Sequence, residues 1–275
     1  MSQTGSYKIQ SIAKIPELEI KRLNAQVDLF WEKELQHYIQ FGFQDNSSII
    51  EFGSGPGYVT EKILTTFPHS YVTGVEIDPY LVEIAKNYLA QSNIDSEHYN
   101  VMEGSIVKTS FPDDTFDFAV IRLVLEHVPN ALHAVKEVCR ILKPGGKAFF
   151  VDNDFEMHLK TFPHIPELRL LYEAYCKSRF SEGGNPLIGR ELPSYLQKGG
   201  FSNIDFEFIS AHSKILGDQV FLESEGLGIP TQLVQDGFLD SKVLASIALK
   251  WRKMMQSEDH LIVRQLSLCV GEKVI

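Results

Sequence analysis

The chain has 275 residues, of which 44% are hydrophobic and 23% charged, enough for one large core with elaborations or for two small domains. Its 36 acidic residues exceed its 26 basic ones and give a net charge of −10, so we expect no nucleic-acid partner, whose phosphates would be repelled. Cys139, Cys176 and Cys269 have neither metal-ligand nor redox spacing, which favours a reducing cytoplasm. We expect no membrane partner either, because no apolar run can span a bilayer and the first ten residues lack an apolar signal region.

After Pro16, apolar residues from Leu18 to Tyr38 recur at helical spacing and predict one long amphipathic helix. Strands and helices then alternate. The expected strands are SIIEF, SYVTGVEI, HYNVMEG, FDFAVIRLVL and KAFFVD, and the expected helices are YVTEKILTTF, PYLVEIAKNYLAQS and ALHAVKEVCRIL. Asp78, which precedes Pro79, is a natural N-cap for the second of these helices. Such alternation indicates parallel strands joined by right-handed crossovers, with helices on both faces.

This rhythm ends near residue 154, and mostly helical segments interrupt the rest of the chain. We expect an α/β fold, a doubly wound and mostly parallel seven-stranded Rossmann-like sheet with helical lid insertions. The first helix and the insertions should lie over the carboxyl ends of the strands, where open α/β sheets bind ligands. The expected parts are an N-terminal helical lid at 1–41, a cofactor-binding sheet core at 42–154, a helical insertion at 155–188, a continuation of the core at 189–213, a helical insertion at 214–258 and a final strand at 259–275.

A strand ends in a glycine-rich turn and opens a helix at IIEFGSGPGYVT, an arrangement that usually holds a nucleotide. A dinucleotide-binding turn needs the spacing G-x-G-x-x-G, yet counting from Gly53 or from Gly55 puts no glycine at the third position. The Walker lysine is missing too, since no G-K-[ST] follows. Glu51 stands two residues before the first glycine, where it would face a pyrophosphate unfavourably and would suit a cationic ligand.

The pattern acid-x-Gly-x-Gly-x-Gly at a strand end resembles the first motif of class I S-adenosylmethionine-dependent methyltransferases. S-adenosylmethionine has no phosphate and carries an ammonium and a sulfonium. The resemblance covers about residues 49–152, through TGVEID, MEGSIVKTSFPDDTFDFAVI, LVLEHV and ILKPGGK. More loosely, ELEIKRLNAQ and GGNPLIGRELPSYLQKGGF look like the UbiE-like branch, which acts on natural products, lipids or peptides. The resemblance implies an enzyme that uses S-adenosyl-L-methionine.

The resemblance also implies which residues contact the cofactor. The glycines let the backbone approach its amino-acid part, and Glu51 supplies negative charge nearby. Glu76, at the end of the second strand, would bind both ribose hydroxyls. Ile77 would flank the adenine, and Ser105 would reach the adenine amino group, where many relatives have Asp. In this branch the N-terminal segment covers the methionyl end. The expected contacts are Tyr7, Gln26, Glu51, Gly53, Ser54, Gly55, Gly57, Glu76, Ile77, Ser105, Ile106 and Arg122.

The methyl acceptor is less well defined by the sequence. The fourth strand ends in VIRLVLEHV and lacks the Asn-Pro-Pro-Tyr or Asp-Pro-Pro-Tyr segment of enzymes that methylate nucleobase or glutamine nitrogens. A hydroxyl acceptor needs a general base, for which His127 is the candidate, although a histidine at a helix entry more often makes a structural hydrogen bond. Asp152 and Asp154 are further candidates. A carboxylate acceptor needs no base and favours a cationic pocket.

The expected substrate contacts are Arg122, Asp154, Arg179, Arg190 and Tyr175, although a salt bridge or packing explains Arg190 and Tyr175 equally well. VDNDFE could offer oxygen ligands to a metal, but no wider ligand pattern accompanies it, and we expect no metal. We therefore expect O-methylation of a hydroxyl or carboxylate on a small molecule or peptide. N- or C-methylation on the same fold, and a non-catalytic adenosylmethionine-binding protein, are the alternatives.

Overall fold

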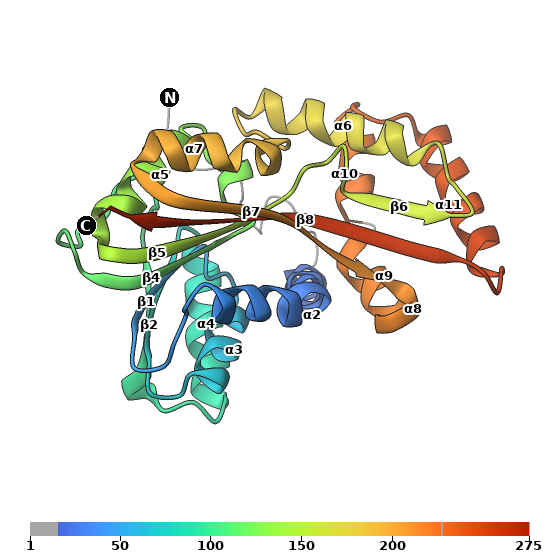
Figure 1. Cartoon of the computed structure of the whole chain (residues 1–275). Coiled ribbons are helices and arrows are strands. Elements are labelled where there is room, and N and C mark those ends of the chain that lie inside the picture. The colour runs from blue at the N-terminus through green and yellow to red at the C-terminus, as the bar shows by residue number, and fades with distance from the viewer. Residues whose placement is uncertain (1–15, 227, 275) are drawn as a thin grey trace.

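The computed structural model describes residues 16–226 and 228–274, so Tyr7 lies outside the described residues. The described chain forms one eight-stranded sheet with the order β3-β2-β1-β4-β5-β8-β6, and β7 pairs with the opposite edge of β8 (Figure 1). Strands β1 to β5 are parallel, and β8 runs antiparallel to β5, β6 and β7. The strands are β1 (Ser48–Phe52), β2 (Tyr71–Glu76), β3 (Tyr99–Glu103), β4 (Phe116–Arg122), β5 (Leu142–Asp152), β6 (Leu159–Phe162), β7 (Phe201–His212) and β8 (Leu261–Lys273).

The α/β class and the mostly parallel sheet are confirmed, but the strand count differs from the expected seven. The additional strand is β6, which lies in a segment expected to be helical. It pairs with Leu261–Arg264 of β8, whereas β5 pairs only with the later residues 267–272. Strand β8 therefore extends beyond the end of β5, and β6 pairs with the part of that edge of β8 that β5 does not reach.

Helices cover both faces of the sheet (Figure 1). Residues of α2 and α3 pack on one face, and residues of α5 and α7 pack on the other. The helices are α2 (Pro16–Gln40), α3 (Tyr58–Thr66), α4 (Pro79–Gln91), α5 (Ala131–Ile141), α6 (Leu168–Ser181), α7 (Leu192–Gly199), α8 (Ser213–Leu216), α9 (Asp218–Glu225), α10 (Gly228–Gln235) and α11 (Ser241–Met255), with short 3₁₀ turns η1 (Ser96–His98), η2 (Leu125–His127) and η3 (Ile188–Glu191). The expected cap of α4 is confirmed, because the Asp78 side chain accepts a hydrogen bond from the amide of Tyr80.

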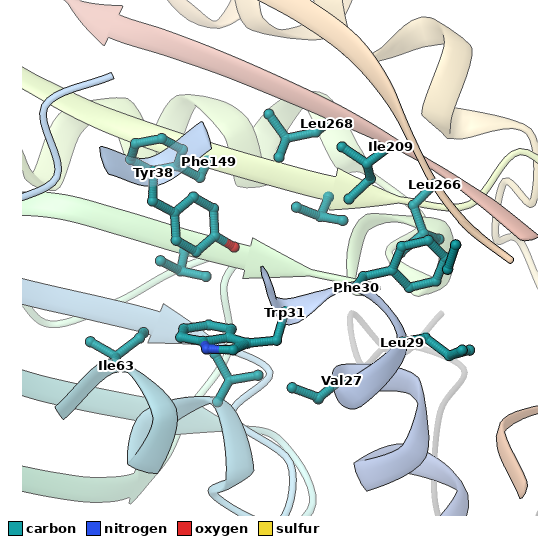
Figure 2. Packing of buried hydrophobic residues seen from close by; sticks show 14 of the residues in the cluster. Val27, Leu29, Phe30, Trp31, Tyr38, Ile63, Phe149, Ile209, Leu266 and Leu268 are labelled. Carbon is teal, nitrogen blue, oxygen red and sulfur yellow. The ribbon is translucent and has the colours of Figure 1, made fainter. Parts of the chain in front are cut away.

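Much of α2 belongs to the core rather than to a separate lid. Figure 2 shows Phe30, Trp31 and Tyr38 of this helix packed among sheet and α3 side chains. The Tyr38 ring centroid lies 4.7 Å from that of Phe149 on β5. Each such buried side chain contributes on the order of 1.5–3 kcal/mol to folding. The later turns of α2 are therefore anchored, and only its first half is free to contribute to a ligand site.

Candidate active site

A cavity of about 530 Å³ opens at the carboxyl ends of β1, β2 and β4. Its walls include residues of α6, α9 and α10 and, from α2, Arg22, Leu23, Asn24, Gln26 and Val27. This volume is in the range of small-molecule sites, and the place is the edge where open α/β sheets bind ligands. The helical segments that interrupt the strand pattern in the sequence thus line the same cavity as the strand ends.

The glycine turn after β1 forms part of this wall. Gly53 and Gly55 have φ angles of +68° and +51°, which residues with a side chain rarely adopt. A Cβ atom on Gly53 would also lie 2.4 Å from Cγ2 of Val124. Between the two glycines, the Oγ of Ser54 is buried and has no hydrogen-bond partner among the described residues. A tight backbone turn with an unsatisfied buried hydroxyl fits a ligand that binds against it.

Gly57 has a different role from the one expected. In the described part of the chain it is absent from the cavity wall. It is the N-cap of α3 with a φ of +85°, and a Cβ atom there would lie 3.2 Å from Cβ of Ala85 and 3.3 Å from Cγ of Leu89. Gly57 therefore permits close packing of α3 against α4 rather than contact with a ligand.

Glu76 ties together the turns that follow β1 and β2. Its buried carboxylate accepts hydrogen bonds from the backbone amides of Gly55 at 2.9 Å, Ile77 at 2.7 Å and Asp78 at 2.9 Å. Burial raises the pKa of this carboxyl group, and the three amide donors oppose the rise. Glu76 and Ile77 both line the cavity, as a ribose contact and an adenine neighbour would.

Glu51 is buried at the end of β1, also in the cavity wall. Its carboxylate accepts a hydrogen bond from Oγ1 of Thr60 at 2.5 Å. Burial, together with the nearby Glu76, raises the pKa of Glu51 to about 8, although the Thr60 hydrogen bond and the charge of Arg122 oppose the rise. At neutral pH the group is mostly uncharged until a cation lies beside it. In the sequence, residue 60 mattered only because a dinucleotide-binding turn would have glycine there. The hydrogen bond from Thr60 to Glu51 was therefore not expected.

Ser105 and Ile106 line the cavity beside the turn that follows β3. The Ser105 hydroxyl accepts a hydrogen bond from the backbone amide of Val107 at 3.3 Å, so it shapes its own loop as well as facing the cavity. Gly104 precedes it, and a Cβ atom there would lie 2.8 Å from Cγ1 of Val75. The loop can therefore approach β2 only because residue 104 is glycine.

Arg122 and Gln26 lie together at the junction of β4 and α2. The Arg122 guanidinium binds Glu34, which is 0% exposed, at 2.9 Å, and donates to the backbone carbonyl of Gln26 at 2.7 Å. Both residues line the cavity. The positive charge of Arg122 is matched by a buried carboxylate, so its first role is to hold α2 against the sheet.

His127 lies at the other end of the cavity, next to Glu126 on η2. Its Nε2 is 3.8 Å from a carboxylate oxygen of Glu126. Burial and, to a smaller extent, the positive charges of Arg179 and Arg22 lower the pKa of His127 to about 3. The imidazole is therefore neutral at physiological pH but is a weak base.

Tyr175 and Arg179 extend from α6 into the same wall. The Tyr175 hydroxyl donates to the carboxylate of Glu126 at 3.4 Å, and the Arg179 guanidinium binds Glu182 at 2.7 Å. The Tyr175 ring stacks on Phe155 with centroids 4.0 Å apart. These contacts connect the lid helix directly to the end of the fourth strand.

Asp154 and Arg190 do not reach the cavity within the described residues. The Arg190 guanidinium forms two hydrogen bonds with the carboxylate of Asp154 and a third with Glu156 at 2.8 Å. The expected substrate contacts of this pair are therefore replaced by a structural ion pair. Asp154 is buried, and so its charge requires the guanidinium partner.

Several wall residues were not singled out from the sequence. Arg264 on β8 is 1% exposed, and its guanidinium lies 3.2 Å from the carboxylate of Glu225. His158 contacts the same Glu225 at 3.2 Å and the side chain of Asn153 at 3.1 Å. These residues come from three late segments that meet only in the folded chain, and no local motif marks them.

Residues 16–226 and 228–274 contain no group of three or more His, Cys, Asp or Glu side chains arranged to hold a metal ion. Within the same ranges, no helix is both long enough and apolar enough to cross a membrane.

The fold and the site together define a class of protein. The first strand of a parallel sheet ends in a glycine turn, with a buried acid before that turn and another at the end of β2, and this arrangement suits a nucleoside ligand that carries positive charge. Residues 50–150 match the family described as "Methyltransferase domain". Residues 50–150 thus form a class I S-adenosylmethionine-dependent methyltransferase domain, and S-adenosyl-L-methionine is the cofactor of this enzyme.

Relatives and solved structures agree with this class. The chain is 22% identical over 185 residues to the demethylmenaquinone methyltransferase of Listeria monocytogenes, covering 64% of this chain and 72% of the relative. It is 32% identical over 148 residues to an uncharacterised methyltransferase of Schizosaccharomyces pombe, covering 52% of each. The fold is similar to that of a putative methyltransferase from Bacillus halodurans, with a TM-score of 0.56, 16% identity, and coverage of 89% and 98%. It is also similar to phosphoethanolamine N-methyltransferase 2 of Haemonchus contortus bound to S-adenosyl-L-methionine, with a TM-score of 0.58, 15% identity, and coverage of 91% and 56%.

Proposed function

We propose that the protein methylates an oxygen nucleophile of a small molecule or peptide that binds beneath α6, α9 and α10. One observation carries this proposal: the cofactor-binding strand ends and a polar group around Glu126 and His127 line one continuous cavity. Residues of α6, α9 and α10 line this cavity, where they would shield a bound ligand from water, as methyl transfer requires. A cytoplasmic location belongs to the same proposal and is supported by the three free cysteines.

The cofactor supplies a methyl group on a sulfonium, which is already activated for displacement. The residues that would hold it are Glu51, Gly53, Glu76, Ile77 and Ser105, all of which line the cavity. The protein's own contribution is to align the acceptor with the methyl group and to remove a proton where the acceptor carries one.

A hydroxyl acceptor is better supported than a carboxylate. The three arginines considered for a carboxylate pocket each have an acidic partner: Arg122 binds a buried glutamate, Arg179 binds Glu182 and Arg190 binds Asp154. Their charges are therefore already compensated. The low pKa of His127 makes it a poor proton acceptor, so we assign it a contact role rather than that of the base.

Carbon methylation is a second candidate. The Listeria relative is named for demethylmenaquinone, which favours an aromatic acceptor. An ionised ring hydroxyl makes the neighbouring ring carbon nucleophilic as well as the oxygen, so both reactions begin with loss of the same proton.

Two measurements test the proposal. Calorimetry should show micromolar binding of S-adenosylhomocysteine, and tighter binding of NAD would contradict the cofactor assignment. Incubation with S-adenosyl-L-methionine and panels of phenols, carboxylates and amines should then yield S-adenosylhomocysteine with phenols. NMR of the product locates the methyl group on oxygen, carbon or nitrogen. Binding without turnover of any acceptor would favour the non-catalytic alternative.

A further inference from the structure

The cavity wall contains a buried carboxylate, that of Glu126, to which the cofactor contacts assign no role. Glu126 is 3% exposed and lines the cavity. One carboxylate oxygen accepts a hydrogen bond from Nδ2 of Asn153 at 2.7 Å and lies 3.8 Å from Nε2 of His127. The other accepts from the Tyr175 hydroxyl at 3.4 Å. The carboxylate thus meets three polar side chains that also face the cavity.

The backbone of Glu126 is fixed by two separate segments. Its amide donates to the carboxylate of Asp152 at 3.3 Å, and its carbonyl accepts from the amide of Asn185 at 2.9 Å. A Cβ atom on Gly184 would lie 2.4 Å from that carbonyl oxygen, so the loop after α6 can pack here only because residue 184 is glycine. A side chain held in this way offers a proton acceptor in a constant position.

We propose that Glu126 accepts the proton of a weakly acidic hydroxyl, such as that of a phenol or an enol, on the methyl acceptor. This inference rests on the proposed methyltransferase function. The O–H bond breaks and the proton goes to the Glu126 carboxylate. The oxygen, or a ring carbon activated by it, forms a bond to the methyl carbon. The carbon–sulfur bond breaks and its electron pair stays on sulfur, which leaves S-adenosylhomocysteine. The proton on Glu126 then passes to solvent.

The charges around Glu126 suit this role. Burial raises the pKa of Glu126 to about 7, while Asn153, Arg179, Arg264 and Tyr175 oppose the rise. The group is therefore partly ionised at neutral pH, where a general base is most effective.

The pKa values of the neighbouring acids and histidines are shifted by different causes. Burial, and then the charge of Glu126, hold the pKa of Asp152 well above its usual range. Burial lowers the pKa of His158 as it does that of His127. Arg264 and His158 outweigh the effect of burial on Glu225, whose pKa is about 2. Of the three cavity residues Glu126, His127 and Glu225, Glu126 is the one whose pKa lies near neutrality.

The first experiment compares two probes that share a ring system, 2-naphthol and 2-naphthoate, with protein saturated with S-adenosyl-L-methionine. Only naphthol must lose a proton. We expect naphthol turnover to rise with pH to a plateau, with an acidic limb at or below about pH 7, and Glu126→Gln to lower it by about 10²–10⁴-fold. The control Glu173→Gln, an exposed residue of α6, should leave it unchanged. Full naphthol turnover by Glu126→Gln, or a wild-type rate without the limb, would overturn the proposal.

The second experiment does not depend on an acceptor. Infrared difference spectroscopy between pH 5 and 9, with S-adenosylhomocysteine bound, should show a carboxyl band that titrates in the wild type and is missing in Glu126→Gln. A band that persists in the variant would overturn the assignment.

Binding of S-adenosylhomocysteine distinguishes failure of the Glu126 assignment from failure of the proposed function. Both proteins should bind it, which shows that the variant is folded. Turnover of naphthoate alone, or of neither probe, by protein that binds it would overturn the hydroxyl assignment and leave the cofactor site standing. Failure of the wild type to bind it would overturn the proposed function itself.

Discussion

Glu51 makes cofactor affinity depend on pH in a direction that the structure fixes. Its pKa is about 8 because it is buried, with Thr60 as its hydrogen-bond partner and Glu76 nearby. A ligand ammonium beside it favours the ionised form, so binding expels the proton. Affinity should therefore rise as the pH rises toward 8 and level off above that value.

The size of the effect follows from the fraction of Glu51 that is ionised before binding. With a pKa of about 8, roughly one molecule in a hundred is ionised at pH 6 and about half at pH 8. If the bound carboxyl group ionises below pH 6, the affinity should increase roughly 50-fold between these pH values, or ~2.3 kcal/mol. The protein without ligand should behave oppositely: Glu51 holds its proton more tightly in the folded than in the unfolded chain, so stability falls as pH rises from about 4.5 to 8.

Calorimetry with S-adenosylhomocysteine at pH 6, 7 and 8 measures this dependence, and buffers of different ionisation enthalpy count the released proton. Glu51→Gln should flatten the pH dependence and bind more weakly than the wild type at pH 8. Glu83→Gln, an exposed change on α4, should behave as the wild type. An affinity that is constant or falls between pH 6 and 8 would refute the placement of Glu51 beside a cation.

Three substitutions test other parts of the site. Arg122→Met should cost about 3–5 kcal/mol in urea unfolding, because Glu34 is left buried without its partner; unchanged stability would contradict that pairing. Gly53→Ala should lower S-adenosylhomocysteine affinity more than tenfold in calorimetry, while Gly228→Ala, where a Cβ atom has nothing within 4 Å, should not; equal affinities would show that the turn tolerates a side chain. Glu76→Ala should weaken cofactor binding by roughly 2–4 kcal/mol and also lower the melting temperature, because three backbone amides lose their acceptor; retained affinity would move the ribose contact elsewhere.

The sheet and the position of the glycine turn at its edge could be predicted because their signals are local. Alternating apolar strands and helices specify a parallel sheet, and the glycine turn with Glu51 and Glu76 falls at strand ends. The role of Gly57 was wrong because a glycine in a motif can serve packing instead, and here α4 approaches it closely. Strand β6 was missed because its four residues carry no periodic pattern and its pairing depends on the length of β8.

The acceptor end was harder to predict because its properties depend on burial and on distant partners. LEHV places Glu126 and His127 side by side, and an unperturbed histidine is the usual base near neutral pH. In the folded chain, burial lowers the pKa of His127 to about 3 and raises that of Glu126 to about 7, so that the glutamate and not the histidine titrates near neutral pH. From the sequence, Arg190 was expected to bind a substrate carboxylate, but in the structure its guanidinium forms an ion pair with Asp154. The residue types alone predict neither these pKa shifts nor the Arg190–Asp154 ion pair.

The three glutamates Glu51, Glu126 and Glu225 line the same cavity, but their pKa values differ because their surroundings differ. Glu225 is matched by Arg264 and His158, so its proton is lost far below neutral pH and its charge is structural. Glu51 is buried with one hydroxyl partner and remains uncharged, which leaves a place for a cation from outside the protein. Glu126 lies between these extremes, because an amide, a phenol and more distant guanidinium groups offset its burial only in part. The positive partners of each acid thus decide how far burial raises its pKa, and this difference separates the structural charge of Glu225 from the two acids that we propose to meet the cofactor and the acceptor.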